Sequence, residues 1–270
     1  MSAQKNPDDI PRTIHYCWFG GNLLGEQELR CMESWRKYLP GYEIVCWDES
    51  NFDIRCCDYV SEAYDAKKWA FVSDYARFKI LYERGGIYFD TDVELVQPID
   101  DILANGPFMG FETDSDGIEV GSVNAGLGLS VGPGLDLYQS ILDSYENDHF
   151  VKDGESFDQT TVVIRVTRIL EQSGLKPLLG IQDVAGVTIY PAEYFNPKDM
   201  YTGEIRITSN TRSIHHFSMS WFTEKDIFEH NIGRHLRKIG LPEKMVFKLC
   251  AVAEIVRFAD LERVLKRVRG

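Results

Sequence analysis

The chain has 270 residues, of which 44% are hydrophobic and 26% are charged, and its formal net charge is -13. This composition is typical of a globular protein with one large α/β domain and excludes a mainly disordered chain. The acidic balance excludes a nucleic-acid-binding protein, because such proteins carry a basic surface. An acidic protein that binds a nucleotide diphosphate needs a cation or a local basic patch to offset the repulsion.

The first part of the chain predicts a strand, a helix and a second strand. Residues 14–19 are a short apolar and aromatic run that ends at two glycines, as a buried strand would. Residues 26–38 are predicted to form a helix, which Pro40 stops, and residues 42–47 are predicted to form the next strand. This order is typical of the start of a parallel α/β sheet.

The next predicted helix begins at Ser73, whose side chain can cap it, and ends at Arg84, before two glycines. Residues 87–89 are predicted to form a strand that has Asp90 at its carboxyl end. The later part of the chain predicts strands at 108–111, 126–131, 187–191 and 213–217, and helices at 135–146 and 159–172.

The last forty residues differ from the rest of the chain in charge. Residues 231–270 contain ten Lys or Arg and four Asp or Glu, and from Pro242 onward apolar residues recur at helical spacing. We therefore predict a catalytic domain over residues 1–230 and a basic amphipathic helical tail over residues 231–270. Such a helix either lies on an anionic membrane surface or packs on its own domain with a solvated basic face.

The predicted location is the cytoplasm, with peripheral membrane contact through the tail as the alternative. Residues 1–9 are polar and lack the apolar segment of a signal peptide, and no run of about 18 apolar residues could span a membrane. The six cysteines form no CxxC pair, which favours buried thiols in a reducing compartment over a disulfide framework.

Two carboxylates, Asp90 and Asp92, are the main candidates for chemistry. Residues two apart in an extended segment point to the same side, so this pair would form a site of oxygen ligands for Mg²⁺ or Mn²⁺. A second pair, Asp114 and Asp116, precedes Gly117 and is interpreted as a solvated turn. The first pair is favoured because open α/β sheets bind ligands at the carboxyl ends of their strands.

The sequence around this pair resembles a known family. The segments SDYAR at residues 73–77 and LYERGGIYFDTD at residues 81–92 resemble the sugar-binding DXD region of family 32 glycosyltransferases. IHYCWFGG at residues 14–21 is similar to the family's first strand, and HHF at residues 215–217, followed by Ser-Trp, is similar to its closing motif. The family includes fungal initiating mannosyltransferases and many bacterial capsule and lipopolysaccharide enzymes, and the glucosylating toxins have a related core.

The resemblance implies a GT-A fold with a Rossmann-like nucleotide-sugar-binding sheet, a UDP- or GDP-sugar donor, Mn²⁺ or Mg²⁺ as cofactor, and retention at the anomeric carbon. It implies that Trp18 stacks on the base and that Asp74 and Arg77 hold the ribose and the donor sugar. It also implies that Asp90 contacts the sugar or ribose and the metal, and that Asp92 ligates the metal directly.

Some of these residues have simpler explanations. Asp74 and Arg77 are three residues apart on one helix face, so a surface ion pair is the alternative for them. Trp18 could instead belong to the core. His216 is chosen as the third metal ligand, because imidazole suits Mn²⁺, and His215 is expected to point to the opposite side of the same strand.

Further candidates follow later in the chain. Asn124 has small neighbours that let a ligand approach the backbone. Asp158 and Gln159 resemble a pair that lies near the reacting sugar in other retaining enzymes, which makes Asp158 a catalytic candidate, with a helix N-cap as the alternative. Ser220 and Trp221 are predicted to form a loop that closes over the diphosphate and excludes water, although Trp221 could be a core residue.

The predicted function is a retaining, metal-dependent glycosyltransferase that uses a saccharide or lipid-linked saccharide acceptor in surface polysaccharide biosynthesis. The sequence has no nucleophile elbow, Walker A or Rossmann glycine string, so hydrolase, kinase and dehydrogenase functions have no support. The alternatives are a small effector that glycosylates a protein, a glycosidase with two carboxylates, and a nucleotide-sugar-binding domain without catalysis.

Overall fold

The computed structural model describes residues 10–152, 156–218 and 223–258. The chain divides into two compact units, and the first contains the residues up to Pro197 together with Ile207–His216. The second contains Lys198–Arg206 and the chain from Phe217 onward. Helix α8 (Glu224–Lys238) belongs to the second unit, so the boundary predicted between residues 230 and 231 falls inside this helix.

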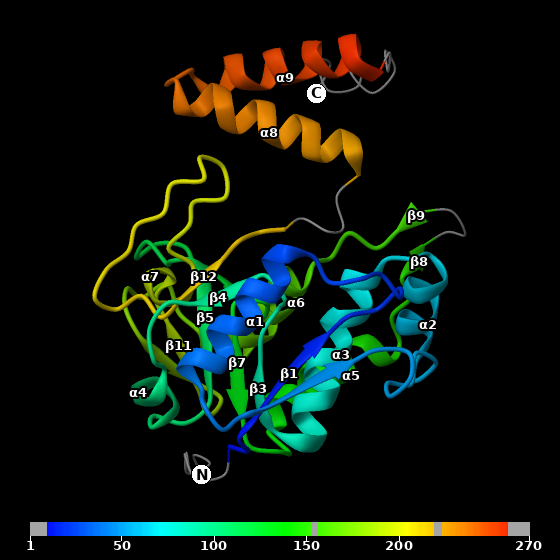
Figure 1. Ribbon diagram of the computed structural model, residues 1–270, viewed down its shortest axis with the longest axis vertical. Coiled ribbons are helices and arrows are strands. Elements are labelled where there is room, and N and C mark those ends of the chain that lie inside the picture. The colour runs from blue at the N-terminus through cyan, green and yellow to red at the C-terminus, as the bar shows by residue number, and fades with distance from the viewer. Residues whose placement is uncertain (1–9, 153–155, 219–222, 259–270) are drawn as a thin grey trace. The chain divides into compact units, whose positions relative to one another are not determined.

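The first unit is built on an eight-stranded sheet with the order β10-β11-β5-β7-β3-β1-β2, in which β6 pairs with β5 (Figure 1). Strand β1 is parallel to β2 and β3, and β5 is parallel to β11, while β7 pairs antiparallel with β3 and β5 between the two groups. The strands are β1 (Thr13–Cys17), β2 (Glu43–Trp47), β3 (Gly86–Tyr88), β5 (Phe108–Thr113), β6 (Ser122–Asn124), β7 (Leu129–Val131), β10 (Gln182–Val184) and β11 (Val187–Tyr190).

Two short strand pairs lie outside this sheet. Strand β4 (Val93–Leu95) pairs antiparallel with β12 (Ser213–His215), and β8 (Val151–Lys152) pairs antiparallel with β9 (Ser156–Phe157). The pairing of β4 with β12 joins segments that are far apart in the sequence, and it lies directly after the DXD motif. It therefore brings the end of the first unit to the candidate site.

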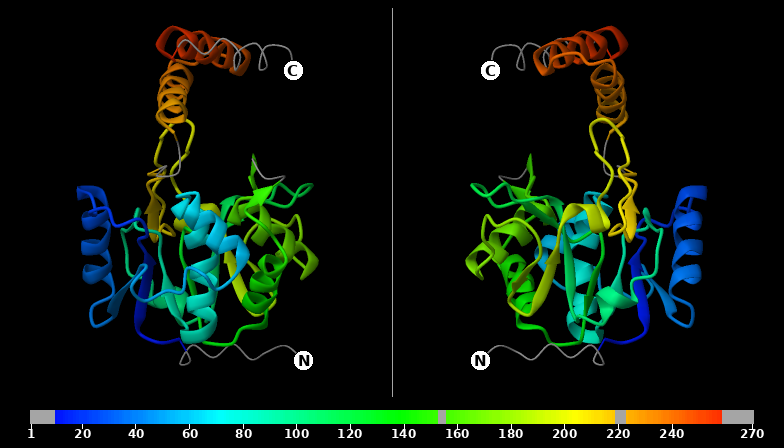
Figure 2. Two further views of the ribbon diagram at one scale, coloured as in Figure 1. Left: turned by 90° about the vertical axis from the view of Figure 1, so that its right-hand side faces the viewer. Right: turned by 90° about the vertical axis from the view of Figure 1, so that its left-hand side faces the viewer.

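Helices cover both faces of the sheet, as the side views in Figure 2 show. One hydrophobic cluster contains side chains of α1, and the other contains side chains of α2, α3, α5 and α6. The helices of this unit are α1 (Glu26–Tyr38), α2 (Asp58–Asp65), α3 (Trp69–Arg84), α4 (Asp100–Leu103), α5 (Asp136–Glu146), α6 (Val162–Gln172) and α7 (Ala192–Phe195).

The strands alternate between these two clusters. In β1, Ile14 and Tyr16 pack with α1, while Cys17 packs on the other face. In β3, Ile87 and Tyr88 divide in the same way. Successive side chains of a strand point to opposite faces, and a central strand with helices on both sides is apolar on both. This explains why the strands in the sequence are short continuous apolar runs.

The α/β class and the helical C-terminal region are confirmed, and so is the strand-helix-strand opening. Helix α1 has the predicted bounds, and β1 and β2 are parallel, with Thr13 opposite Glu43. The predicted start of α3 at Ser73 is wrong, because the helix begins at Trp69 and the Ser73 hydroxyl donates to the Trp69 carbonyl, 3.1 Å away. Helix α6 begins three residues later than predicted, and Thr161 caps it.

The second unit contains α8 and α9 (Glu243–Phe258). Thr223 and Asp226 form a capping box at the start of α8, which the sequence analysis did not predict. The two helices pack through Phe228 and Phe258, whose ring centroids are 5.5 Å apart. No helix in the described part of the chain is long and apolar enough to cross a membrane.

Candidate active site

The DXD motif lies in a turn immediately after β3. The amide of Val93 donates to the carbonyl of Asp90 over 3.0 Å, which closes a turn over residues 90–93. The prediction that Asp90 and Asp92 lie in an extended segment is therefore wrong. Because the chain turns between them, the alternation of a pleated strand does not fix their relative orientation.

Arg77 connects α3 to this turn. Its Nη2 lies 2.9 Å from Asp74 Oδ1 and 3.3 Å from Asp90 Oδ1, and its Nε donates to the carbonyl of Ser73 over 3.1 Å. Only 3% of Arg77 is exposed, and Asp74 is also buried. The ion pair between Arg77 and Asp74 is therefore not a surface pair. The contact of Arg77 with Asp90 holds the Asp90 side chain in place. A buried guanidinium with two carboxylate partners is costly to break.

Tyr88 is a site residue that the sequence analysis missed. Its hydroxyl donates to Asp90 Oδ1 over 3.0 Å, and the guanidinium carbon of Arg77 lies 4.9 Å from its ring centroid. Burial raises the pKa of this tyrosine well above its usual value, so the hydroxyl stays a donor. The sequence feature that could have identified Tyr88 is its position two residues before Asp90, within the family-like segment at residues 81–92.

Gly126 closes the other side of the motif. A β-carbon at this position would lie 2.2 Å from Asp90 Oδ2, and the Gly126 carbonyl accepts from the Asp90 amide over 3.3 Å. Asn124, a sequence-predicted binding residue, is buried and holds this turn, because its Oδ1 accepts from the Gly126 amide over 2.7 Å. Its Nδ2 donates to Glu112 Oε2 over 2.6 Å. The small neighbours of Asn124 therefore make room for Asp90.

Asp74 is the carboxylate whose protonation the site changes most clearly. Burial raises its pKa from the usual 3.8 to about 6, although Arg77 opposes the rise, and the nearby Asp90 adds to it. Asp74 also accepts a backbone hydrogen bond from Val162, at the first residue of α6. The same carboxylate therefore links α3 to the start of α6.

The structure places His215, rather than His216, beside the second aspartate. His215 Nε2 lies 3.2 Å from Asp92 Oδ1, and both side chains are buried. His216 Nε2 lies 2.8 Å from Glu94 Oε2, and its amide donates to the Asp92 carbonyl. The assignment of His216 as the third metal ligand stays a prediction, and in this structure its side chain contacts Glu94.

The donor chemistry of the two aspartates fits a hard divalent cation, since carboxylate oxygens are the ligands that Mg²⁺ and Mn²⁺ accept. Within residues 10–152, 156–218 and 223–258, no group of three or more His, Cys, Asp or Glu side chains is arranged to hold a metal ion. Asp90 and Asp92 by themselves would supply only part of a coordination shell. Phosphate oxygens and waters commonly supply the remainder for Mg²⁺.

The other predicted binding residues are placed as follows. Trp18 is half-buried at the end of β1, and its indole nitrogen donates to the Asn22 carbonyl over 2.7 Å. Gln159 is exposed, and its side-chain amide donates to the Phe157 carbonyl over 3.3 Å. Ser220 and Trp221 lie outside the described residues.

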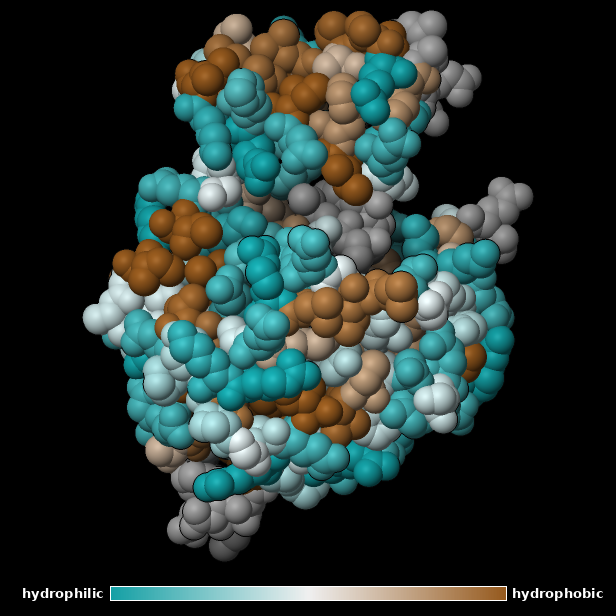
Figure 3. Space-filling model, viewed as in Figure 1, coloured by the Kyte–Doolittle hydropathy of each residue, from teal (hydrophilic) through white to brown (hydrophobic). Residues whose placement is uncertain are grey.

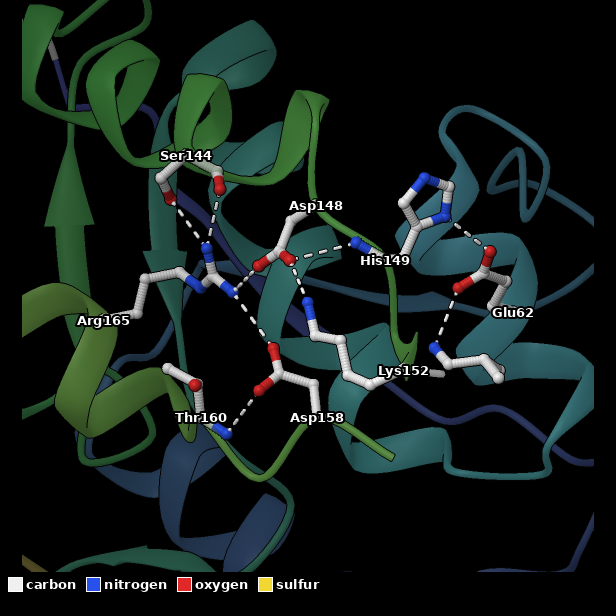
Figure 4. A network of polar contacts seen from close by, with 9 residues as sticks. Glu62, Ser144, Asp148, His149, Lys152, Asp158, Thr160 and Arg165 are labelled. Atoms are coloured by element: carbon white, nitrogen blue, oxygen red, sulfur yellow. Dashed lines mark hydrogen bonds and ion pairs between the residues drawn. The ribbon is translucent and has the colours of Figure 1, made fainter. Parts of the chain in front are cut away.

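Asp158 belongs to a second ionic cluster, which Figure 4 shows. Its Oδ2 lies 3.5 Å from Arg165 Nη2, and its Oδ1 accepts from the Thr160 amide over 2.9 Å. Thr161 is the N-cap of α6, so the alternative interpretation of Asp158 as the N-cap is wrong. Asp148 is the closer partner of Arg165, at 2.6 Å. Asp158 is thus anchored in the loop before α6.

The second DXD-like pair has local partners of its own. Asp114 Oδ1 accepts from the Ala192 amide over 2.8 Å, and Asp116 Oδ1 accepts from the amides of Ile118 and Glu119. Both residues are exposed. Asp116 therefore stabilises a turn, as predicted, and Asp114 ties that turn to the start of α7.

A comparison with known proteins identifies a family that matches the segment around the DXD motif. Residues 25–109 match the family described as "Glycosyltransferase sugar-binding region containing DXD motif". This range contains α1, α3, β3 and the turn at Asp90. Residues 25–109 therefore carry a glycosyltransferase sugar-binding region with a DXD motif.

Two curated relatives and one solved structure illustrate the similarity. "Inositol phosphoceramide mannosyltransferase 1" of Schizosaccharomyces pombe is 29% identical over 119 residues, which cover 40% of this chain and 36% of the relative. "Subversion of eukaryotic traffic protein A" of Legionella pneumophila is 24% identical over 187 residues, which cover 59% of this chain and 28% of the relative. The chain spans about a third of the length of these curated relatives. The solved structure "PaToxG Glycosyltransferase" has a TM-score of 0.44 and 19% identity, covering 60% of this chain and 69% of that chain.

Proposed function

We propose that this protein is a retaining, metal-dependent glycosyltransferase that transfers a sugar from a UDP- or GDP-sugar to a saccharide acceptor. The observation that carries the proposal is the buried bridge from Arg77 to Asp74 and Asp90, at the carboxyl end of β3. The strand order, with β7 antiparallel beside β3, also suits the nucleotide-sugar-binding sheet of a GT-A fold.

In this proposal, two carboxylates of the site bind the ribose and the sugar of the donor, which carry no charge. Asp74 and Asp90 accept hydrogen bonds from hydroxyls of the ribose and the donor sugar, and Trp18 stacks on the base. Arg77 holds both carboxylates in place and offsets negative charge that builds up nearby as the bond to the leaving diphosphate breaks. Because Arg77, Tyr88 and Gly126 fix Asp90 before the donor binds, little reorganisation is needed during the reaction.

Asp92, with Asp90, would hold Mn²⁺ or Mg²⁺, and His215 would orient Asp92 through the 3.2 Å contact. When bound, the cation supplies charge neutralisation to the diphosphate. His216 stays a candidate metal ligand only if it exchanges its contact with Glu94 for one with the cation. The loop with Ser220 and Trp221 is proposed to cover the diphosphate and to exclude water.

Retention follows if the acceptor hydroxyl attacks C1 from the face that the diphosphate leaves. In that step the C1–O bond to the acceptor forms, the C1–O bond to the diphosphate breaks, and a leaving phosphate oxygen takes the acceptor's proton. Asp158 is proposed to lie near the reacting sugar, with Gln159 and Asn124 as further contacts. The contact between Asp158 and Arg165 holds that carboxylate in a fixed orientation.

The acceptor class draws on the relatives. The S. pombe protein is named for transfer to inositol phosphoceramide, a lipid, which supports a lipid-linked saccharide as acceptor here, in surface polysaccharide biosynthesis on the cytoplasmic side of a membrane. The L. pneumophila protein is named for subversion of eukaryotic traffic, and we propose as a second candidate function an effector that glycosylates a protein. Transfer of sugar to a protein, rather than to a lipid-linked saccharide, would identify this second function.

The test is donor binding and transfer by matched variants. Thermal stability is measured against a panel of UDP- and GDP-sugars with and without Mn²⁺, because a ligand that binds only the folded state raises its stability. We expect one donor to raise the melting temperature only when Mn²⁺ is present. Asp92→Ala should abolish this shift and the transfer of sugar, whereas Asp116→Ala, in the exposed second pair, should leave both unchanged. Full activity of Asp92→Ala with the metal chelated would overturn the proposal.

A further inference from the structure

Helix α9 has two apolar faces, and only one of them packs against its own unit. Val246, Cys250 and Glu254 are buried, and they recur at spacings of four residues. Glu243, three residues before Val246, falls on the same side and bonds Arg237 of α8 over 2.8 Å. Both acidic residues of α9 are therefore on the side that faces α8.

The opposite face carries exposed apolar side chains. Met245, Leu249, Val252 and Val256 follow spacings of four, three and four residues, which align them along one side of a helix. Their exposed fractions are 48%, 41%, 56% and 82%. Hydrophobic side chains gather along α9 in the space-filling view of Figure 3. We call these four residues the outer stripe.

The charge beside the outer stripe is positive. Lys248 lies four residues before Val252, and Lys244 lies one further turn back, so the two ammonium groups follow one edge of the stripe. Both lysines are exposed. The sequence after α9 contains four basic residues, Arg263, Lys266, Arg267 and Arg269, against two acidic residues, Asp260 and Glu262. An apolar stripe edged by lysine is suited to a surface that is apolar within and anionic at its boundary.

We propose that the outer stripe of α9 docks on an anionic lipid surface. The four apolar side chains enter the boundary between headgroups and acyl chains, while Lys244 and Lys248 contact the anionic headgroups. A second copy of the chain fits less well, because it would bring a second row of lysines against the first. This proposal does not depend on the proposed sugar transfer, since none of its residues belongs to the candidate active site.

The test is co-sedimentation of the full chain with vesicles of phosphatidylcholine alone or mixed with phosphatidylglycerol. We expect binding to the mixed vesicles that weakens with added salt. Lys244→Gln with Lys248→Gln should weaken partitioning about 30-fold, since each lysine near an anionic surface contributes a free energy equivalent to about a fivefold change in partitioning. Val252→Asp with Val256→Asp should weaken partitioning at least about tenfold, because each substitution places a charge where two methyl groups would enter the membrane.

Phe247→Asp is the matched control, because Phe247 lies on the same helix with a similar exposed fraction, 46%, but off the outer stripe. It should bind vesicles as the unchanged chain does. The proposal is overturned if the chain does not bind the mixed vesicles, if neutral vesicles bind equally well, or if Phe247→Asp reduces binding as much as the stripe variants. It is also overturned if Val252→Asp with Val256→Asp converts a dimer to a monomer or lowers the melting temperature without affecting vesicle binding. Donor-dependent stabilisation by Mn²⁺ should be unchanged in the stripe variants, so a failure here leaves the proposed function standing.

Discussion

Arg77 and Arg165 each lie at the centre of an ionic cluster in the first unit, but the two clusters differ in completeness. Arg77 uses Nε, Nη1 and Nη2 to bind Ser73, Asp74 and Asp90. Arg165 binds the Ser144 carbonyl and Asp148 more tightly, at 2.7 and 2.6 Å, yet its buried Nε has no hydrogen-bond partner among the described residues. The shorter hydrogen bonds thus belong to the cluster whose arginine has a nitrogen without a partner among the described residues.

The difference matches what each cluster does. The Arg77 cluster holds a carboxylate of the DXD motif, and each of the three guanidinium nitrogens has a partner, so the geometry is fixed in advance of binding. The Arg165 cluster ties the loop at Asp158 to α5 and β8, and its carboxylate Asp148 remains 23% exposed. Solvent can compensate part of what is lost there. Satisfaction of the central arginine, rather than the shortest distance, therefore distinguishes the cluster that holds the DXD carboxylate.

The largest effect should come from removing each arginine in turn. Arg77→Ala leaves two carboxylates without their buried partner and should lower the free energy of unfolding by about 3–5 kcal/mol, with loss of donor binding. Arg165→Ala should lower it by about 1–3 kcal/mol, because Asp148 is partly solvated. Urea unfolding of both variants checks the order. Equal losses would show that the two clusters do not differ as described.

The second effect is a loss of stability with rising pH that Asp74, in the Arg77 cluster, should cause. The folded-state pKa of Asp74, about 6, is above its unfolded value of 3.8, so the folded protein binds more protons between these pH values. Stability from this group is present below pH 3.8 and is lost as the pH rises through 6, by about 3 kcal/mol at most. Asp74→Asn should flatten the profile of unfolding free energy between pH 4 and 6. If Asp74→Asn leaves the slope of unfolding free energy against pH unchanged, groups other than Asp74 cause that slope.

The third effect separates the position of Asp90 from its presence. Gly126→Ala places a β-carbon 2.2 Å from Asp90 Oδ2. Arg77 binds this oxygen and Tyr88 binds the other oxygen of the same carboxylate, so displacing the carboxylate should reduce kcat/KM by about 10- to 100-fold. Gly25→Ala is the matched control, since its β-carbon would lie 2.6 Å from Glu28 Oε2, at the free end of a flexible side chain. It should leave kcat/KM unchanged. Transfer assays of the two variants measure the contrast.

The smallest effect should appear at the rim of the Arg165 cluster. His149 Nδ1 lies 2.7 Å from Glu62 Oε1, and this hydrogen bond raises the pKa of the exposed histidine above 6.5. The stabilisation is complete below the unfolded pKa and is lost as the pH rises through the folded one. His149→Ala should therefore lower the melting temperature slightly more at pH 5.5 than at pH 8. A larger loss at pH 8 would contradict the assignment.

Much of the first unit was predictable because its signals are local. The strand at Ile14 and helix α1 follow from apolar runs and glycine or proline ends. The start of α3 was missed because Trp69 to Val72 are apolar and continue the helix, so the first residue that can cap, Ser73, was taken as its beginning. Helix α8 was missed although Thr223 and Asp226 form a capping box, since few of its residues are buried.

The site was predictable in its composition and less so in its orientation. Asp74, Arg77 and Asp90 meet as a helix spacing and a strand end suggest. The pairing of Asp92 with His215 was not predicted, because it depends on a turn that breaks the strand and on how β12 aligns with β4. The register in which two distant strands pair cannot be predicted from the sequence of either strand alone.

The pairing of β12 with β4 also sets an order of assembly. His216 and Glu94 are 122 residues apart in the sequence, so the contacts around Asp92 close one of the longest loops in the unit. Contacts between distant residues form late, because the entropy of loop closure must be overcome before they stabilise the chain. A growing polypeptide that has not yet emerged past His216 can already build the sheet from β1 to β11. Competence to bind a donor would then appear last, as a property of the finished unit and not of its early folding core.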